Sequence, residues 1–245
     1  MPNLLLTGII AAAFALVHIV GKDLRFLQRT PRSIWLSLAG GVSLAYVFVH
    51  LLPELAEWQK ASARHIGANA FAVESHIYLA ALLGLVVFYG LDRLVRQSKR
   101  KNRDVGQPGS SPRVFWIHLS SYAVYSVLIG YLLVHREEAD LRGLVIYAIA
   151  LGLHFVVNDQ GLREYHGDAY DRTGRWLLAA APPLGWLIGT GFALSPLLIA
   201  LVFGFLAGGL VLNVLKEELP EDRESRFGAL AAGAAGFALL LLIAR

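Results

Sequence analysis

Eight stretches of mainly apolar residues, each long enough to cross a lipid bilayer, constrain this chain more than any other feature of its sequence. A membrane-spanning helix needs roughly 20 such residues, and charged residues flank most of the stretches. They are Leu4–Val20, Ile34–Leu52, Val73–Leu94, Val114–Val134, Leu141–Asn158, Trp176–Phe192, Pro196–Leu215 and Phe227–Ala244. We therefore predict an all-α polytopic membrane helix bundle with eight transmembrane helices, in a single membrane domain that spans residues 1–245.

The composition excludes several classes of protein. Hydrophobic residues make up 56% of the chain and charged residues only 16%, which leaves too little polar surface for a soluble domain of 245 residues. The basic residues lie between apolar runs and form no aromatic-interleaved patch, so nucleic acid is not an expected partner. Because the chain has no cysteine, disulfides, thiolate metal sites and thiol catalysis are excluded.

The distribution of Lys and Arg predicts the orientation of the helices. The connections after the first, third, fifth and seventh helices carry 17 of the 22 basic residues, and the other connections together with the C-terminus carry 5. Cytoplasmic loops are enriched in Lys and Arg, so both termini are predicted to be non-cytoplasmic. Residues 97–113 then form a flexible basic cytoplasmic loop between the third and fourth helices. This loop acts as a topology determinant or, alternatively, contacts anionic lipid head groups.

The N-terminus enters its apolar run directly after Met1-Pro2-Asn3. It has no basic segment and no small-residue cleavage site, so the first helix is expected to act as the targeting signal. The lack of an organellar presequence favours the bacterial inner (plasma) membrane as the location.

Proline and small residues predict local features of the last three helices. Pro196 supports a turn at Ala193–Ser195, and Pro182-Pro183 predicts a kink or break in the sixth helix. Small residues four apart let helices approach closely. The pairs with this spacing are Gly204/Gly208, Ala229/Gly233 and Ala232/Gly236.

Ionisable residues at membrane depth are costly and therefore mark candidate functional positions. The fifth helix carries His154 and Asn158 four apart on one face, with Tyr147 above them and Asp159 beside them. An imidazole and an amide oxygen one turn apart can ligate a metal ion, and Asp159 would add negative charge. The same side chains can instead hydrogen-bond a neighbouring helix, and the sequence leaves both interpretations open.

The fourth helix carries a polar stripe at helical spacing that should face protein or water and not lipid. Its members are the pore-lining candidates His118, Ser121, Tyr122 and Tyr125. These side chains are weak metal ligands, and hydrogen bonding between helices is the alternative role.

Polar residues also occur in three other helices. His50 and Glu54 share a face at the outer end of the second helix, where they form either an outer mouth or an interfacial cap. Asn213, near the inner end of the seventh helix, is a further pore-lining candidate. His18 is isolated in the first helix, which favours a structural role.

A segment dense in Arg, acidic residues, His and Tyr follows the fifth apolar run and extends to Arg175. Asp159 and Arg163 are four apart and are expected to pair. The density of opposite charge predicts an ordered cytoplasmic plug or gate, and a solvated extension of the helix is the alternative.

Three segments, in this order, resemble the ZIP (Zrt/Irt-like) family of divalent-metal transporters. Residues 41–54 (GVSLAYVFVHLLPE) are similar to the second helix of that family, residues 183–189 (PLGWLIG) to its sixth, and residues 207–221 (AGGLVLNVLKEELPE) to its seventh. The resemblance covers most of the chain. It implies a ZIP-like arrangement of eight helices, with outside termini and a long cytoplasmic loop after the third.

The metal centre implied by this resemblance is degenerate in the present sequence. The family builds its intramembrane site from a His-x-x-x-Glu pattern on each of the fourth and fifth helices. His154 matches the histidine on the fifth helix, but Asn158 stands in place of the glutamate. On the fourth helix, Ser121 and Tyr125 occupy the two positions. A dication in a low dielectric needs negative partners, and Asp159 is the acidic residue next to this pattern.

The resemblance implies transport of a divalent metal ion, zinc or similar, with His154, Asn158 and Asp159 as core ligands and His50 and Glu54 at the outer mouth. One alternative is a ZIP-fold protein that has lost transport and acts as a membrane scaffold or regulator, or that carries a non-metal solute. Another is an intramembrane hydrolase with a metal-held water. No second histidine or carboxylate at ligand spacing supports it, so no enzymatic activity is expected.

The expected partners are membrane lipid and the metal ion as substrate. Such a bundle could also form a homodimer. No further cofactor is expected.

Overall fold

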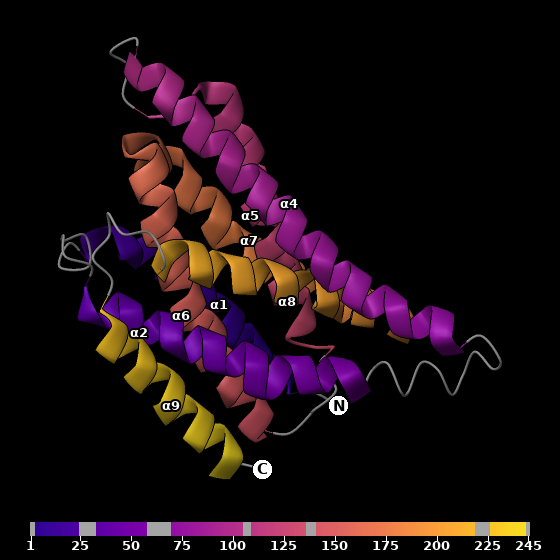
Figure 1. Cartoon of the computed structure of the whole chain (residues 1–245). Coiled ribbons are helices and arrows are strands. Elements are labelled where there is room, and N and C mark those ends of the chain that lie inside the picture. Colours follow the sequence, from indigo (N-terminus) through magenta and orange to yellow (C-terminus); the bar gives the residue numbers. More distant parts are fainter. Residues whose placement is uncertain are drawn as a thin grey trace. The chain divides into compact units, whose positions relative to one another are not determined.

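The computed structural model describes residues 3–24, 33–57, 70–104, 109–135, 141–218 and 226–243, and every regular element within these ranges is helical (Figure 1). The α-helices are α1 (Leu4–Val20), α2 (Ile34–Ala45), α4 (Ala70–Asp104), α5 (Pro112–Leu132), α6 (Leu141–His166), α7 (Arg175–Gly191), α8 (Pro196–Glu218) and α9 (Phe227–Ile243). Short elements join them, namely the 3-10 helix η1 (Gly21–Asp23) and the π-helices η3 (Tyr46–Leu51) and η4 (Tyr170–Gly174). The predicted all-α class is confirmed for the described residues.

Each apolar stretch of the sequence coincides with a helix, and six helical segments are long and apolar enough to cross a membrane. These segments are Leu4–Asp23, Ile34–Glu57, His76–Asp104, Pro112–Leu132, Leu141–His166 and Pro196–Lys216. Large apolar side chains on these helices are exposed, as a lipid-facing surface requires; Leu5 is 75% exposed and Trp35 64%. The chain is therefore a multi-pass integral membrane protein. Membrane crossing by α7 and α9, each of 17 residues, and the non-cytoplasmic termini stay predictions.

Two helices extend beyond the bounds predicted from hydropathy. α6 continues past Asn158 to His166, and α4 continues to Asp104, so that part of the predicted flexible loop 97–113 is helical. An apolar run ends at the first charged residues, but Arg, Lys, Gln and Glu are good helix formers and prolong a helix that has begun. In α4, Arg96 Nε also donates to Asp92 Oδ2 one turn earlier, at 2.7 Å. Residues 105–108 of the loop lie outside the described ranges.

The two prolines of α7 do not interrupt the helix, so of the predicted kink or break the break is wrong, while the kink stays a prediction. α5 approaches α7 closely here: a Cβ added to Gly130 would overlap the carbonyl oxygen of Pro182. Close packing against a neighbouring helix is what makes proline tolerable inside a membrane helix. The turn predicted after this helix is confirmed, because α7 ends at Gly191 and α8 begins at Pro196.

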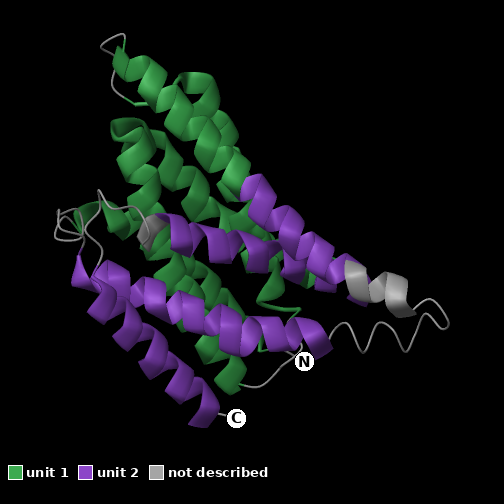
Figure 2. Ribbon diagram, viewed as in Figure 1, with its two compact units in different colours: residues 1–29, 89–192 green, residues 30–88, 193–245 purple. Residues whose placement is uncertain are grey.

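The chain divides into two compact units (Figure 2). Unit 1 comprises residues 1–29 and 89–192, and therefore contains α1, the end of α4, α5, α6, η4 and α7. Unit 2 comprises residues 30–88 and 193–245, and contains α2, η3, the beginning of α4, α8 and α9. The single membrane domain expected from the sequence stays a prediction.

In unit 1, α7 packs against both α1 and α5, and α1 also packs against α6. The α5–α7 approach is reciprocal, because a Cβ added to Gly185 would overlap a backbone carbonyl oxygen of α5. Trp186 Nε1 of α7 donates to Thr7 Oγ1 of α1 at 2.9 Å. Phe14 of α1 packs edge-on against Phe155 of α6, with ring centroids 5.2 Å apart. These contacts hold α1 beside α6, where the buried polar residues lie.

In unit 2, α2 lies alongside α9, and α4 lies alongside α8 (Figure 1). A Cβ added to Gly41 or Gly233 would overlap a backbone carbonyl oxygen of the partner helix in the α2–α9 pair. Gly204 and Gly208 of α8 meet carbonyl oxygens of α4 in the same way. The predicted close helix packing is thus confirmed at Gly204, Gly208 and Gly233, whereas no described atom lies within 4 Å of a Cβ placed at Gly236.

Gly233→Ala is expected to destabilise the protein by about 1–3 kcal/mol, because the added methyl group forces α9 away from α2. Gly236→Ala, the same change almost one turn later, should leave the thermal unfolding midpoint unchanged or raise it, since alanine is the better helix former. Thermal unfolding of both variants in detergent measures this difference. Equal midpoints would contradict the close approach of α9 to α2.

Candidate functional site

The C-terminal half of α6 is buried although it is rich in polar residues. In unit 1, Asn158, Asp159 and Gln160 are 4%, 0% and 2% exposed, and Arg163 is 8% exposed. Charged side chains almost never lie at this depth without partners. The partners of Asn158, Asp159 and Arg163 come from α6 itself, from α1 and from the turn that leads into α7.

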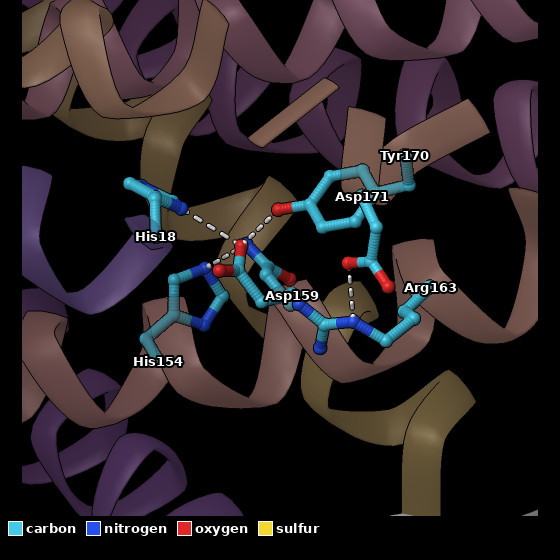
Figure 3. A network of polar contacts seen from close by, with 7 residues as sticks. His18, His154, Asp159, Arg163, Tyr170 and Asp171 are labelled. Carbon is cyan, nitrogen blue, oxygen red and sulfur yellow. Dashed lines mark hydrogen bonds and ion pairs between the residues drawn. The ribbon is translucent and has the colours of Figure 1, made fainter. Parts of the chain in front are cut away.

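Asp159 is held by two donors on one carboxylate oxygen (Figure 3). His18 Nδ1 from α1 donates to Asp159 Oδ1 at 2.8 Å, and the Tyr170 hydroxyl from η4 donates to the same oxygen at 2.6 Å. Because a carboxylate only accepts hydrogen bonds, the Nδ1 atom of His18 carries a hydrogen. Asp159 therefore ties α1, α6 and η4 together through buried polar contacts.

A glycine turn brings Tyr170 back onto α6. Gly167 adopts φ +54°, in the left-handed region that favours glycine, and its N–H donates to the Arg163 carbonyl oxygen at 2.8 Å. The N–H groups of Tyr170 and Asp171 then donate to the Gly167 carbonyl oxygen at 3.0 and 3.3 Å. η4 begins directly after this reversal, which places its first side chain beside Asp159.

Arg163 and Tyr170 complete the polar cluster. Arg163 Nε donates to Asp171 Oδ1 at 2.8 Å, and the guanidinium lies over the Tyr170 ring, 5.3 Å from its centroid. Burial, followed by the Asp159 carboxylate, raises the pKa of the Tyr170 phenol well above its usual value. Tyr170 therefore keeps its hydrogen and remains a donor to Asp159.

His154 lies one turn before Asn158 and is fully buried. Its Nε2 is 3.0 Å from Asn158 Nδ2 and 3.4 Å from the Tyr125 hydroxyl of α5. An amide N–H can only donate, so Nε2 accepts and the neutral ring carries its hydrogen on Nδ1. The structure therefore brings together His154 and Asn158, as predicted, and adds Tyr125 from the polar stripe of the fourth predicted helix.

A second chain of polar contacts joins the end of α6 to α5. His118 Nδ1 is 2.8 Å from His166 Nε2, and His166 Nδ1 is 2.9 Å from the Ser110 hydroxyl. His118 and His166 are 1% and 7% exposed. The polar stripe of α5 thus provides one of its members, His118, to a histidine pair.

Several buried atoms of the cluster around Asp159 have no hydrogen-bond partner among the described residues, and Arg163 Nη1 and Nη2 are donors of this kind. Three others are acceptors. They are Asn158 Oδ1, Asp159 Oδ2 and His18 Nε2. In a neutral His18 ring with its hydrogen on Nδ1, Nε2 is an acceptor like the other two. This part of unit 1 therefore holds three buried acceptors whose capacity the described donors do not fill.

The other predicted positions have different surroundings. Ser121 Oγ donates to the Ile117 carbonyl oxygen of its own helix at 2.8 Å, while Tyr122 is buried. His50 and Glu54 belong to unit 2, with 3.9 Å between Nε2 and Oε2, and Asn213 is fully buried in the same unit. Across the described ranges, no three His, Asp or Glu side chains form a group that could hold a metal ion by themselves.

Some residues of the site were not predicted. His18 was expected to be isolated, and it contacts a residue 141 positions away. Arg163 was expected to pair with Asp159, but it donates to Asp171 because the turn at Gly167 brings η4 back against α6. The charged segment forms the end of α6 and the helix η4, so the predicted helix extension is present, and its role as a plug or gate stays a prediction. Its density of Tyr and Arg was the signal that could have identified Tyr170.

No protein-family model matches this sequence, and no curated protein is significantly similar to it. The ZIP-like architecture therefore stays a prediction from the three sequence segments.

Proposed function

We propose that the protein is a ZIP-like transporter of a divalent metal ion such as zinc, which binds on α6 at His154, Asn158 and Asp159. The observation that supports this most is the pair of buried acceptors, Asn158 Oδ1 and Asp159 Oδ2, without a donor among the described residues. A buried polar atom left unsatisfied costs about 1–3 kcal/mol, and more when it is charged. A cation that binds between the two side chains would supply the missing partner of these oxygens.

The mixture of ligand atoms favours a transition-metal ion. Imidazole nitrogen suits zinc and its neighbours, whereas Mg²⁺ and Ca²⁺ prefer sites made only of oxygen. His154 Nε2 now accepts from Asn158 Nδ2 at 3.0 Å. A half-turn of the Asn158 amide would exchange Nδ2 and Oδ1, so that the amide oxygen and the imidazole nitrogen face the same point.

The single negative charge of the site favours release of a bound dication, as transport requires, over its permanent retention. Asp159 supplies one negative charge, and its Oδ1 already accepts from His18 and Tyr170. A dication held there keeps a net positive charge in a low dielectric, which predicts weak retention. In this proposal, eight helices with outside termini cross a bacterial inner membrane, and helix bundles rock around the site to expose it to each side in turn.

A second candidate is a ZIP-fold scaffold or regulator without transport, or a carrier of a non-metal solute. The two hydrogen bonds to Asp159 Oδ1 favour it, because they link α1, α6 and η4 in a fixed arrangement without any ion. The two proposals differ in whether Asp159 Oδ2 receives a cation.

Purified protein in liposomes that contain a zinc-sensitive dye is expected to admit Zn²⁺ and to discriminate against Mg²⁺. His154→Ala should lower the initial rate of Zn²⁺ entry about tenfold or more, since loss of a single ligand costs at least about 1.4 kcal/mol of site affinity. His76→Ala is the matched control, because His76 is exposed in unit 2 and should leave the rate unchanged. Failure of the wild-type protein to admit any divalent ion would reject transport and leave the scaffold proposal.

A further inference from the structure

We propose that Ser110, His166 and His118 form a proton pathway from the turn before α5 into the interior of unit 1. The hydrogen-bonded chain runs from the half-buried Ser110 hydroxyl to His166 Nδ1 at 2.9 Å, and from His166 Nε2 to His118 Nδ1 at 2.8 Å. Chains of histidine within membrane helices are a recurring basis of proton relays. Ser110, His166 and His118 are not among the residues assigned to the cation.

One hydrogen lies between the two facing ring nitrogens, His118 Nδ1 and His166 Nε2. Two imidazole nitrogens at 2.8 Å can share a hydrogen bond only if one donates and the other accepts. The short separation lets the hydrogen pass from one ring to the other without movement of the rings. Ring nitrogens that are both buried would be costly to leave unpaired, which stabilises this alignment.

A proton crosses the pair by four balanced changes. When His166 carries its hydrogen on Nε2, an incoming proton forms a bond to His166 Nδ1 from the Ser110 side. The Nε2–H bond of His166 breaks as a bond to His118 Nδ1 forms, and the Nε2–H bond of His118 breaks as the proton passes to a water molecule on the inner side. One proton enters and one leaves, and rotation of the rings restores the first tautomers.

The inner end of the pathway leads along α5. His118 packs edge-on against Tyr122, with ring centroids 5.0 Å apart, and Tyr122 lies 6.4 Å from the Tyr125 ring. The Tyr125 hydroxyl is in turn 3.4 Å from His154. These aromatic side chains lie between His118 and the face of α6 where the cation is proposed to bind.

The charged groups around the pair are arranged so that they do not trap the proton. Tyr165 of α6 faces His118, with centroids 6.0 Å apart, and its hydroxyl donates to Asp92 Oδ1 of α4 at 2.8 Å. Asp92 also accepts from Arg96 at 2.7 Å, so its negative charge is compensated. Lys99 donates to the Glu164 carbonyl oxygen at 2.9 Å. A compensated carboxylate does not hold an excess proton on the histidines, which favours conduction.

A proton pathway would also compensate the charge of the transported ion. A dication at a site with one carboxylate leaves a positive charge unmatched. That charge would repel an excess proton from the His118–His166 pair to water past Ser110, which removes one positive charge. This coupling rests on the proposed function, whereas the pathway itself does not. Zn²⁺ entry is therefore expected to be accompanied by proton movement.

Voltage-driven proton flux tests the pathway without any metal ion. Liposomes that hold the full chain and a pH-sensitive dye are given an interior-negative potential with potassium and valinomycin. The wild-type protein should acidify the interior faster than empty liposomes do. His118→Gln and His166→Gln should each reduce the added flux about tenfold or more, because an amide hydrogen-bonds but cannot relay a proton. The control His135→Gln should leave it unchanged, since His135 donates to the Gly189 carbonyl oxygen outside this chain.

A solvent-isotope measurement and a comparison of proton flux with Zn²⁺ entry separate the outcomes. Replacing H₂O by D₂O around the wild-type protein should slow the flux more than solvent viscosity alone does, which tests the relay even if both variants misfold. Wild-type flux equal to that of empty liposomes, or folded variants with unchanged flux, would overturn the pathway. Proton flux without Zn²⁺ entry would reject the proposed transport function but retain the pathway, and Zn²⁺ entry without proton flux would do the opposite.

Discussion

Asp159→Ala is expected to lower the free energy of unfolding by about 2–6 kcal/mol, because it leaves two buried donors, His18 Nδ1 and the Tyr170 hydroxyl, without their acceptor. Each unsatisfied donor contributes about 1–3 kcal/mol to this loss. Asp168→Ala is the matched control, since it removes the same charge from an exposed position close in the chain. Unfolding in detergent, followed by circular dichroism, measures both variants. Equal stability of the two would contradict the buried network.

Asp159→Asn separates the stabilising role of this residue from its proposed binding role. The amide oxygen can still accept from His18 and Tyr170, so most of the stability should remain, whereas the negative charge is lost. Zn²⁺ entry into liposomes should therefore fall much more than the unfolding midpoint. A His18→Ala/Asp159→Ala double-mutant cycle should give a coupling energy of about 0.5–3 kcal/mol, the range measured for residues in direct contact. A coupling near zero would show that the contact contributes nothing.

Gly185→Leu is expected to prevent stable folding of unit 1. Any Cβ at this position overlaps the Val127 carbonyl oxygen, so the α5 and α7 backbones would have to separate. Overpacking of a well-packed region typically costs about 1–3 kcal/mol, and displacement of whole backbones lies at or beyond the upper end. The yield of monodisperse protein and its thermal midpoint should both fall sharply.

Gly191→Leu provides the comparison for this prediction. It makes the same change at the end of α7, where no described atom lies within 4 Å of an added Cβ. Leucine is a better helix former than glycine, so this variant should fold at least as well as the wild-type protein. If the two variants behaved alike, the α5–α7 distance would have to be larger than the structure shows.

The helix positions could be predicted well because they depend on local properties. α1 has the bounds Leu4–Val20 that its apolar run predicts, and the Asn3 side chain accepts from the Leu6 N–H at its start. The ends of α4 and α6 were less predictable, because charged residues end an apolar run without ending a helix. The loop assigned to 97–113 was too long for the same reason.

The polar residues of α6 were identified as candidates because the cost of burial depends on residue type. His154 and Asn158 meet as the helical spacing predicts, at 3.0 Å. Their surroundings were not predictable: the Tyr125 contact depends on how α5 lies against α6, and the His118–His166 pair joins residues 48 positions apart. Arg163 shows the same limit, since it binds Asp171 and not Asp159, the acid one helical turn before it.

Apolar run length and residue type suffice to locate the helices of this protein and to show that α6 carries its costly polar side chains. The partners of Asp159 emerge only when the helices are packed, because His18 is 141 residues away and Tyr170 returns through a left-handed glycine turn. A helix forms through contacts within one segment, so its sequence contains the necessary information. A buried hydrogen bond between segments depends on the fit of many side chains at once, and no local pattern contains that fit.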